Sequence, residues 1–344
     1  MASLKSSCNC DDCRFYNLCG GCHPECNHAG CARPCSSCPV RCRRREDVEA
    51  WIRDVGGTLD LSFPRTVDWP PVPGDLPPVV PEVDGYRTAE YDAAANHPAY
   101  AVGASRVFSK KGAGLRPRWR GRRAAGVLGL PPGKKVVLHM FGPDELIERL
   151  WTEQLRCRLW DQVAGAGFAL VLGPNYSVYG EHPRFEHLIN MRRSLLAAVR
   201  LASLGVPVAP NVYWWTERDL ERWCRCVEKL KIPAIAVNAQ TYRTEKDWAF
   251  LLAGLEYMGA RLGDRVTLFL NGLSRPERVA AARKAVPRVV FVSRDLQMRA
   301  QHGRLFGARR GEYAYGEAPA LFRKNVELFQ QNLRLPALDN VVQS

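Results

Sequence analysis

The sequence lacks any apolar run long enough to cross a membrane. No segment approaches the roughly 20 apolar residues that a membrane-spanning helix needs, and the first residues, MASLKSSCNC, contain no apolar stretch of the kind found in a secretory signal. We therefore expect a cytoplasmic protein with no membrane partner. In that reducing compartment, clustered cysteines hold metal ions more often than they form disulfides, which disfavours a secreted disulfide scaffold.

Three common catalytic motifs are also missing. The sequence contains no GxxxxGK[ST] phosphate loop, no GxSxG nucleophile elbow and no HExxH zinc motif. These absences argue against P-loop nucleotide hydrolases, α/β-hydrolases and zinc metalloproteases.

Acidic residues are absent from position 93 to position 143, and the chain as a whole has a net charge of +14. Unbalanced positive charge attracts polyanions, and the stretch KKGAGLRPRWRGRR adds one aromatic ring that can stack on a base. We therefore expect a nucleic-acid partner, in the first instance DNA, with a solvated basic loop as the alternative. The residues expected to bind it are Arg116, Arg118, Trp119, Arg120, Arg122 and Arg123.

Cysteine is concentrated near the N-terminus, where the spacing is CxCx2Cx5Cx2Cx3Cx4Cx3Cx2Cx3C. Thiolates two or three residues apart can bind one tetrahedral ion, so the segment predicts a small module that holds Zn²⁺, with a [4Fe-4S] cluster as the alternative. Its last part, CARPCSSCPVRC, also matches the three-cysteine pattern of radical S-adenosylmethionine enzymes, but it lies far before the first clear strand. The predicted ligands are Cys8, Cys10, Cys13, Cys19, Cys22, Cys26, Cys31, Cys35, Cys38 and Cys42.

The remaining sequence divides into segments of different composition. Apolar residues at helical spacing predict a short helix after the cysteines, ended by Gly56 and Gly57, and a proline-rich stretch follows. We predict a metal-binding module at 1–46, the helix and a linker at 47–85, a basic Gly/Arg-rich segment at 86–133, an α/β domain at 134–335 and a tail at 336–344.

The predicted α/β domain alternates strand-like apolar runs with helical segments. Six runs of strand length are visible, from VVLHM to VVFVS, and residues 86–108 can supply a further strand. Strands with few polar residues that alternate with helices indicate a parallel sheet covered on both faces. We therefore predict a parallel (βα) barrel or partial barrel, with an open doubly wound sheet as the alternative.

Polar side chains follow almost every predicted strand. In a parallel α/β fold the carboxyl ends of the strands form the binding site, although asparagine also favours turns and helix caps. We predict a shared ligand cleft, in which one ring of the sequence YWW covers a flat ligand while another packs in the core. The predicted catalytic residues are Asp295, Asn175, Asn238 and Gln240, and the predicted substrate-binding residues are Tyr176, Asn211, Tyr213, Asn271 and Arg294.

The stretches GPNYSVYGEHPRFEHLINMRRSL, GVPVAPNVYWW and AIAVNAQTYR resemble a family of phage and bacterial proteins known only as a domain of unknown function. The resemblance covers about 168–304 and implies one globular unit around the asparagine-lined cleft. A phage-encoded member would act in the host cytoplasm.

A second resemblance concerns chemistry. The spacing Cys8-x-Cys10-x2-Cys13 is similar to the zinc site of tRNA-guanine transglycosylases, which are parallel barrels with an aspartate nucleophile and have relatives that insert 7-deazaguanines into DNA. Their Asp-Ser-Gly-Gly signature is absent here. The resemblance implies a transferase that modifies DNA by base exchange, with Asp295 attacking the sugar. A non-catalytic, metal-containing DNA-binding or replication accessory protein is the alternative.

The cysteine pattern predicts metal in the purified full-length chain. Elemental analysis should find stoichiometric zinc in a colourless protein, whereas a brown protein with iron and sulfide would establish the iron–sulfur alternative. Replacing Cys31, Cys35 and Cys38 by Ser should lower the metal content, and the same change at Cys157, Cys224 and Cys226 should not. A metal-free wild-type protein would refute the module.

Overall fold

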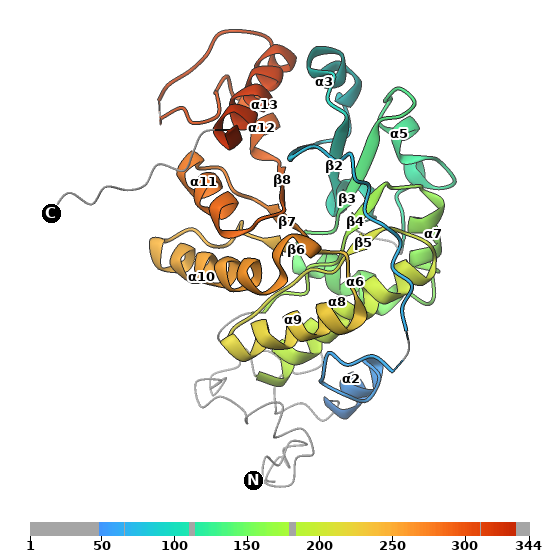
Figure 1. Cartoon of the computed structure of the whole chain (residues 1–344). Coiled ribbons are helices and arrows are strands. Elements are labelled where there is room, and N and C mark those ends of the chain that lie inside the picture. The colour runs from blue at the N-terminus through green and yellow to red at the C-terminus, as the bar shows by residue number, and fades with distance from the viewer. Residues whose placement is uncertain (1–47, 65, 110–113, 179–183, 310, 335–344) are drawn as a thin grey trace, which may run out of the picture.

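The computed structural model describes residues 48–64, 66–109, 114–178, 184–309 and 311–334. In these residues eight parallel strands follow one another around a barrel, in the order β5-β4-β3-β2-β1-β8-β7-β6 (Figure 1). The strands are β1 (Val79–Val83), β2 (Ala99–Gly103), β3 (Lys135–His139), β4 (Leu170–Leu172), β5 (Val208–Ala209), β6 (Ala234–Asn238), β7 (Thr267–Asn271) and β8 (Val289–Ser293).

The barrel is nearly closed by a short contact between its two edge strands. Asn211 forms a parallel bridge with Ala236 just beyond β5. The Val212 N–H donates to the Ala236 carbonyl at 2.7 Å, and the Ala236 N–H donates to the Pro210 carbonyl at 2.8 Å. The predicted parallel barrel is therefore confirmed, and the open doubly wound sheet is wrong.

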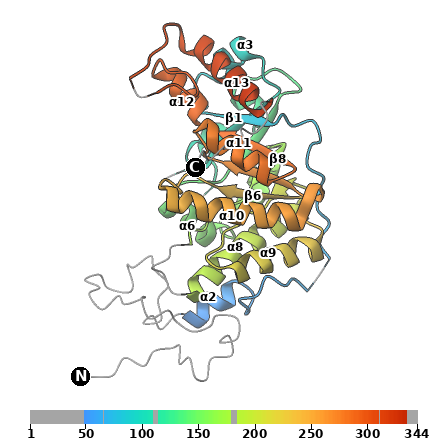
Figure 2. The same cartoon turned by 60° about the vertical axis from the view of Figure 1, so that its left-hand side comes forward.

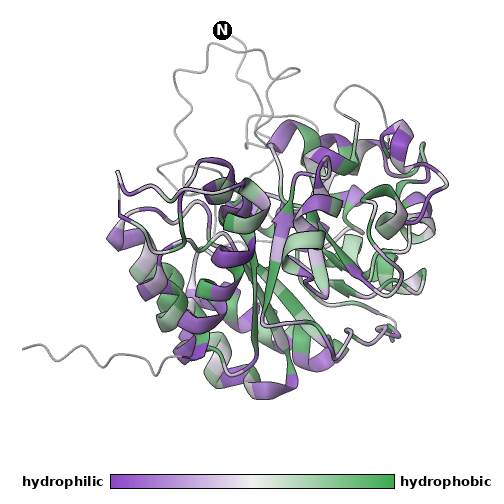
Figure 3. Ribbon diagram, turned by 90° about the horizontal axis from the view of Figure 1, so that it is seen from above, coloured by the Kyte–Doolittle hydropathy of each residue, from purple (hydrophilic) through white to green (hydrophobic). Residues whose placement is uncertain are grey.

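Helices surround the barrel and alternate with its strands (Figures 1 and 2). Hydrophobic residues dominate the strands, and hydrophilic residues gather on the outside of the helices (Figure 3). No helix in the described ranges is long and apolar enough to cross a membrane. The helices are α2 (Val48–Asp54), α3 (Thr88–Ala95), α4 (Ala104–Val107), η2 (Pro117–Trp119), α5 (Ala124–Val127), α6 (Asp144–Glu153), α7 (Leu159–Gly165), α8 (Arg184–Ser203), α9 (Glu217–Leu230), α10 (Glu245–Leu262), η3 (Gly263–Arg265), α11 (Pro276–Ala285), α12 (Asp295–Gln301) and α13 (Ala318–Arg334).

The inside of the barrel is a separate apolar core. Side chains alternate along each strand, so one set packs against the helices and the other faces the barrel axis. The inward set is rich in alanine, which leaves room for Phe269. Its buried members are Val80, Ala99, Ala101, Val137, Leu170, Leu172, Ala209, Ala234, Ala236, Phe269, Val290 and Val292.

The barrel begins earlier than the predicted boundary at residue 134. β1 lies in the predicted linker and β2 in the predicted basic segment, so two of the eight described strands precede that boundary. β2 confirms that residues 86–108 supply a strand. β1 was missed because Pro81 and Glu82 interrupt its apolar pattern, although it pairs with β2 on one side and β8 on the other.

The helix predicted after the cysteines is α2, and the loop after it is tied to the outside of α8 (Figure 1). Gly56 and Gly57 follow α2 with φ values of 86° and 73°, which are not helical, so the helix ends before them as predicted. Arg192 of α8 is buried and donates to the carbonyls of Val55 at 3.1 Å and Asp60 at 2.8 Å, and also to that of Ser62. One guanidinium thus satisfies three backbone acceptors of this loop.

Replacing Arg192 by Met should lower the free energy of unfolding by about 3 kcal/mol, because three carbonyls lose a charged donor. Urea unfolding measures the change. The control is Arg225→Met on α9, where the arginine side chain is 60% exposed and the loss should stay below about 0.5 kcal/mol. Equal losses in the two variants would contradict the role given to Arg192.

Candidate functional site at the barrel mouth

A layer of polar side chains lies directly above the apolar interior of the barrel. Each member stands two residues after an inward-facing apolar residue, so strand alternation turns it toward the axis. All are buried, with exposed fractions between 2% and 8%. The members are Glu82 on β1, His139 on β3, Asn211 after β5, Asn238 on β6 and Asn271 on β7.

Glu82 and His139 form a pair across β2. The Nδ1 atom of His139 lies 2.9 Å from the Glu82 Oε2 atom. Between them β2 presents Gly103, where an added Cβ would lie 2.7 Å from the Glu82 Oε1 atom. The absence of a side chain at Gly103 therefore makes room for the carboxylate. The His139 ring also stacks on Phe141, with centroids 5.9 Å apart and an interplanar angle of 16°.

The asparagines form a hydrogen-bonded row on the other side of the mouth. The Gln240 backbone N–H donates to the Asn238 Oδ1 atom at 3.0 Å, and the Asn271 Nδ2 atom donates to the same oxygen at 3.1 Å. Because a backbone N–H can only donate, this bond fixes the orientation of both amides. The Asn271 Oδ1 atom is then buried with no hydrogen-bond partner among the described residues.

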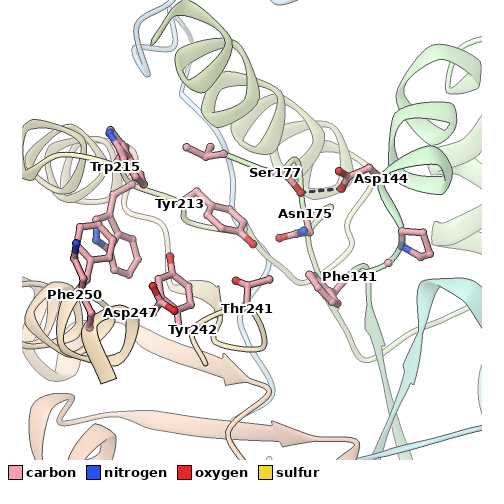
Figure 4. A pocket seen from close by; sticks show the side chains of 15 residues that line it. Phe141, Asp144, Asn175, Ser177, Tyr213, Trp215, Thr241, Tyr242, Asp247 and Phe250 are labelled. Carbon is pink, nitrogen blue, oxygen red and sulfur yellow. Dashed lines mark hydrogen bonds between the residues drawn. The ribbon is translucent and has the colours of Figure 1, made fainter. Parts of the chain in front are cut away.

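A pocket of about 710 Å³ lies beside this polar layer (Figure 4). It is lined by residues that follow β3, β4, β5 and β6, at the carboxyl ends where ligands bind in parallel barrels. Its wall is mainly aromatic, and its polar groups include two carboxylates and one ammonium. The aromatic residues are Phe141, Tyr213, Trp214, Trp215, Tyr242 and Phe250, and the charged residues are Asp144, Lys246 and Asp247.

The aromatic wall is arranged around Phe250 of α10. Its ring stacks on Trp214 and on Tyr242, at centroid distances of 6.1 and 6.3 Å, and it lies 6.3 Å from the ring of Trp215. Trp214 is buried, whereas Trp215 is 46% exposed. This agrees with strand alternation, which predicted that one of these neighbouring rings packs in the core. Gly254 on α10 gives Trp214 its space, because an added Cβ would overlap the indole.

A buried ion pair holds the segment that carries Trp215. Asp219 is fully buried and accepts from the backbone N–H groups of Trp215 and Thr216, both at 3.0 Å. The Arg184 Nη1 atom donates to the same carboxylate at 2.9 Å. Burial raises the pKa of Asp219, but the hydrogen bond and charge of Arg184, together with the two backbone hydrogen bonds, outweigh it, so the pKa lies below its ordinary value.

The predicted cleft residues do not all meet in one place. Asn175 and Tyr213 line the pocket, and Asn211, Asn238, Asn271 and the backbone of Gln240 belong to the polar layer or its hydrogen bonds. Asn211 donates to Asn175, and Asn238 to the Tyr213 hydroxyl, each at 3.5 Å.

Three other predicted residues lie elsewhere. Tyr176 was expected to bind substrate, but its buried ring packs under the Arg193 guanidinium at 4.1 Å and lines no part of the pocket, because it alternates with Asn175. Asp295 and Arg294 follow β8 outside the pocket lining, and Asp295 forms an ion pair with Arg299.

The basic segment is folded more tightly than a free loop. Trp119 is 1% exposed, stacks on Phe168 and donates to the Arg106 carbonyl at 3.0 Å. Its predicted stacking on a base is therefore wrong, because the ring is used in the core. Arg116, Arg118 and Arg120 donate to backbone carbonyls of neighbouring turns.

Arg120, Arg122 and Arg123 are exposed. Arg123 lies against Gly167, three residues before β4 begins, at the opposite end of the barrel from the pocket. These three arginines therefore keep the charge that nucleic-acid binding requires, but Arg123 does not border the pocket.

The predicted metal ligands, Cys8 to Cys42, lie outside the described residues. Within the described ranges, no group of three or more His, Cys, Asp or Glu side chains could hold a metal ion. Burial raises the pKa of Cys224 to about 11 and that of Cys226 to about 12, so both remain thiols at neutral pH. The prediction of Zn²⁺, or a [4Fe-4S] cluster, stays a prediction.

Sequence reasoning missed several residues of the mouth. Glu82 was missed because it lies in the proline-rich stretch. Two signals could have found it: it stands two residues after the apolar Val80, and His139 is a polar residue at the corresponding place on another strand. Phe250 and Tyr242 gave no such signal, because they reach the pocket from α10 and from the loop before it.

One family model matches the part of the chain that carries the pocket. Residues 131–278 match the family described as "Domain of unknown function (DUF4417)", and every residue that lines the pocket lies in this range. A search of curated proteins found no match. One solved structure, titled "Native KDPGal structure", is similar at 14% identity and a TM-score of 0.39, over 75% of this chain and 95% of that chain.

The family match agrees with the resemblance to a domain of unknown function. None of these comparisons shows the transglycosylase likeness, which rests on the cysteine spacing alone.

The lowered pKa of Asp219 predicts a pH-dependent contribution to stability. Because the folded pKa lies below the ordinary value of 3.8, ionised Asp219 stabilises the fold fully above about pH 4 and loses this effect as pH falls through the folded pKa. Asp219→Asn should cost about 3 kcal/mol at neutral pH. Urea unfolding should show a constant gap to wild type between about pH 7 and about pH 5, and a smaller gap near about pH 3.

The matched control is Asp264→Asn in the exposed turn η3, which should track wild type at each pH. A gap for Asp219→Asn that does not narrow in acid would contradict the ion-pair assignment.

Proposed function

We propose that this chain is an enzyme that binds a nucleobase at the barrel mouth and acts on nucleic acid, most concretely by base exchange. The observation that carries the proposal is the aromatic-walled pocket beside a layer of amides and an acid–imidazole pair. Planar heteroaromatic rings stack on aromatic side chains, and amides recognise their polar edges. An enzyme that acts on a base must take it out of the stack into such a concave site.

The size and the exposure of the pocket support this proposal. A volume of about 710 Å³ falls within the range of small-molecule sites. Trp215 and Phe250 keep part of their rings exposed and lie together on one side of the pocket, with Tyr213 between them and Asn175 (Figure 4). A base that enters here reaches Asn175 and Tyr213, which contact the asparagine row.

In the base-exchange form of the proposal, Asp295 is the nucleophile implied by the transglycosylase resemblance. Its carboxylate pairs with Arg299, four residues along α12. Attack on a sugar would therefore require this pair to open. A zinc or iron–sulfur module at the cysteines, together with the exposed arginines, would hold the nucleic-acid backbone.

The exposed arginines are also the observation that favours the alternative, a DNA-binding or accessory protein without catalysis. Under that alternative, nucleic-acid affinity depends on Arg120, Arg122 and Arg123 and not on the pocket. The two functions therefore predict opposite effects of pocket substitutions.

Calorimetric titration with adenine, guanine, hypoxanthine, cytosine, uracil and their nucleosides tests the pocket. We expect at least one base to bind, and Trp215→Ala and Phe250→Ala to weaken that binding by about 1–3 kcal/mol each through lost stacking. Tyr257→Ala is the matched control, because this ring is 36% exposed on the same helix as Phe250 and does not line the pocket.

Absence of binding by every base would refute the proposed nucleobase site. Unchanged action on DNA in the two pocket variants, with loss of DNA binding when Arg120, Arg122 and Arg123 are replaced by Gln, would establish the accessory protein instead. The products of DNA digestion, measured by mass spectrometry, report modification directly.

A further inference from the structure

We infer that Glu82 and His139 form the proton-transfer pair of this site, with His139 as the catalytic residue and Glu82 as the residue that positions it. The inference rests on the proposed nucleobase site and adds the groups that move a proton there. Neither residue was among the expected catalytic residues.

The geometry sets the role of each nitrogen of His139. An ionised carboxylate only accepts hydrogen bonds, so the Glu82 Oε2 atom at 2.9 Å places the proton of a neutral ring on Nδ1. Among the described residues, the His139 ring makes its hydrogen bond through Nδ1, to Glu82. A carboxylate that orients an imidazole through Nδ1 and leaves Nε2 to meet the substrate is a recurrent acid–base arrangement.

The pair lies beside the pocket, and neither residue is part of its lining. The connection runs through Phe141, which lines the pocket and stacks on the His139 ring. The side chain of Glu82 keeps 11% of its surface exposed although it faces the barrel axis. In the described residues, Glu82 forms no ion pair with an arginine or lysine, and its carboxyl group contacts the imidazole.

A purely structural role explains the pair poorly. Taking a carboxylate out of water is costly, and apolar residues of similar size usually stabilise a core as well or better. On the intervening strand, Gly103 also has no side chain that would crowd the carboxylate. The polar layer therefore costs stability that a structural barrel could avoid.

Base exchange needs one proton in each direction, and one imidazole can supply both. His139 first takes a proton from solvent at Nε2. Asp295 then attacks the sugar carbon, the bond from that carbon to the outgoing base nitrogen breaks with its electron pair on nitrogen, and this nitrogen takes the proton from Nε2. The incoming base next loses its ring N–H proton to the same Nε2 as its nitrogen bonds the sugar carbon and displaces the Asp295 carboxylate. The proton taken from solvent at the start returns to solvent at the end, so the proton count closes.

The first test uses nitrogen NMR of the full-length protein labelled with ¹⁵N-histidine, with His139 assigned from His139→Gln. In the free protein, we expect the neutral His139 ring to carry its proton on Nδ1. A saturating free base from the panel should shift the Nε2 signal, and its analogue methylated at the glycosidic nitrogen should not. Glu82→Gln should abolish the single tautomer, Glu82→Asp should restore it, and Glu90→Gln, a surface control with an exposed side chain, should leave it unchanged.

The second measurement is incorporation of a ¹⁴C-labelled free base into single-stranded DNA. His139→Gln and Glu82→Gln should lower the rate by about 100-fold or more, while the dissociation constant of the base changes by less than about threefold. Glu82→Asp should recover part of the rate.

The outcomes separate the two proposals. If a base binds by calorimetry while the His139 signals stay unmoved, or if His139→Gln exchanges bases at the wild-type rate, the proton-transfer role is overturned and the nucleobase site stands. If no base binds, the proposed function fails, and the role of this pair fails with it.

Discussion

Closure of the parallel sheet is the constraint on which the rest of the molecule depends. Once β5 and β6 meet through the Asn211–Ala236 bridge, every strand has one row of side chains that faces the axis. Those rows are apolar inside the barrel, and the rows of β1, β3, β5, β6 and β7 continue into a buried polar residue at the mouth. The chemistry of the mouth is thus fixed by position along the strands, and residues far apart in sequence become neighbours.

The polar layer is built from two kinds of interaction with different consequences. The asparagine row is held by backbone and amide hydrogen bonds, which orient Asn238 and Asn271. The Oδ1 atoms of Asn211 and Asn271 are buried with no hydrogen-bond partner among the described residues. The Glu82–His139 pair depends on a single contact and on the space left by Gly103. Buried polar groups with incomplete pairing are costly, and they are typical of sites that meet a ligand.

The aromatic wall, in contrast, is positioned from outside the barrel. Phe250 comes from α10, and the segment with Trp215 is held by Asp219, which the Arg184 guanidinium and two backbone N–H groups surround. The wall and the polar layer therefore have separate supports. A change in one, such as Asp219→Asn, can loosen the rings without altering the Glu82–His139 pair.

The sequence alone determined the fold class, most of the strands and the polar strand ends, because these follow from local periodicity and from the rule that parallel strands end together. It could not find β1, since a central strand with proline and glutamate resembles a linker until its neighbours are known. It also misassigned Trp119 and Tyr176, whose aromatic rings suit a ligand site and a core equally well.

Only the tertiary structure decided which polar groups meet. The pairing of Glu82 with His139 spans 57 positions, and the contact of Phe250 with Trp214 and Tyr242 joins α10 to two different loops. Such contacts depend on barrel closure and helix packing, which no local pattern encodes. The sequence predicted polar residues at the mouth of the barrel, and the tertiary structure determined which of these residues contact one another.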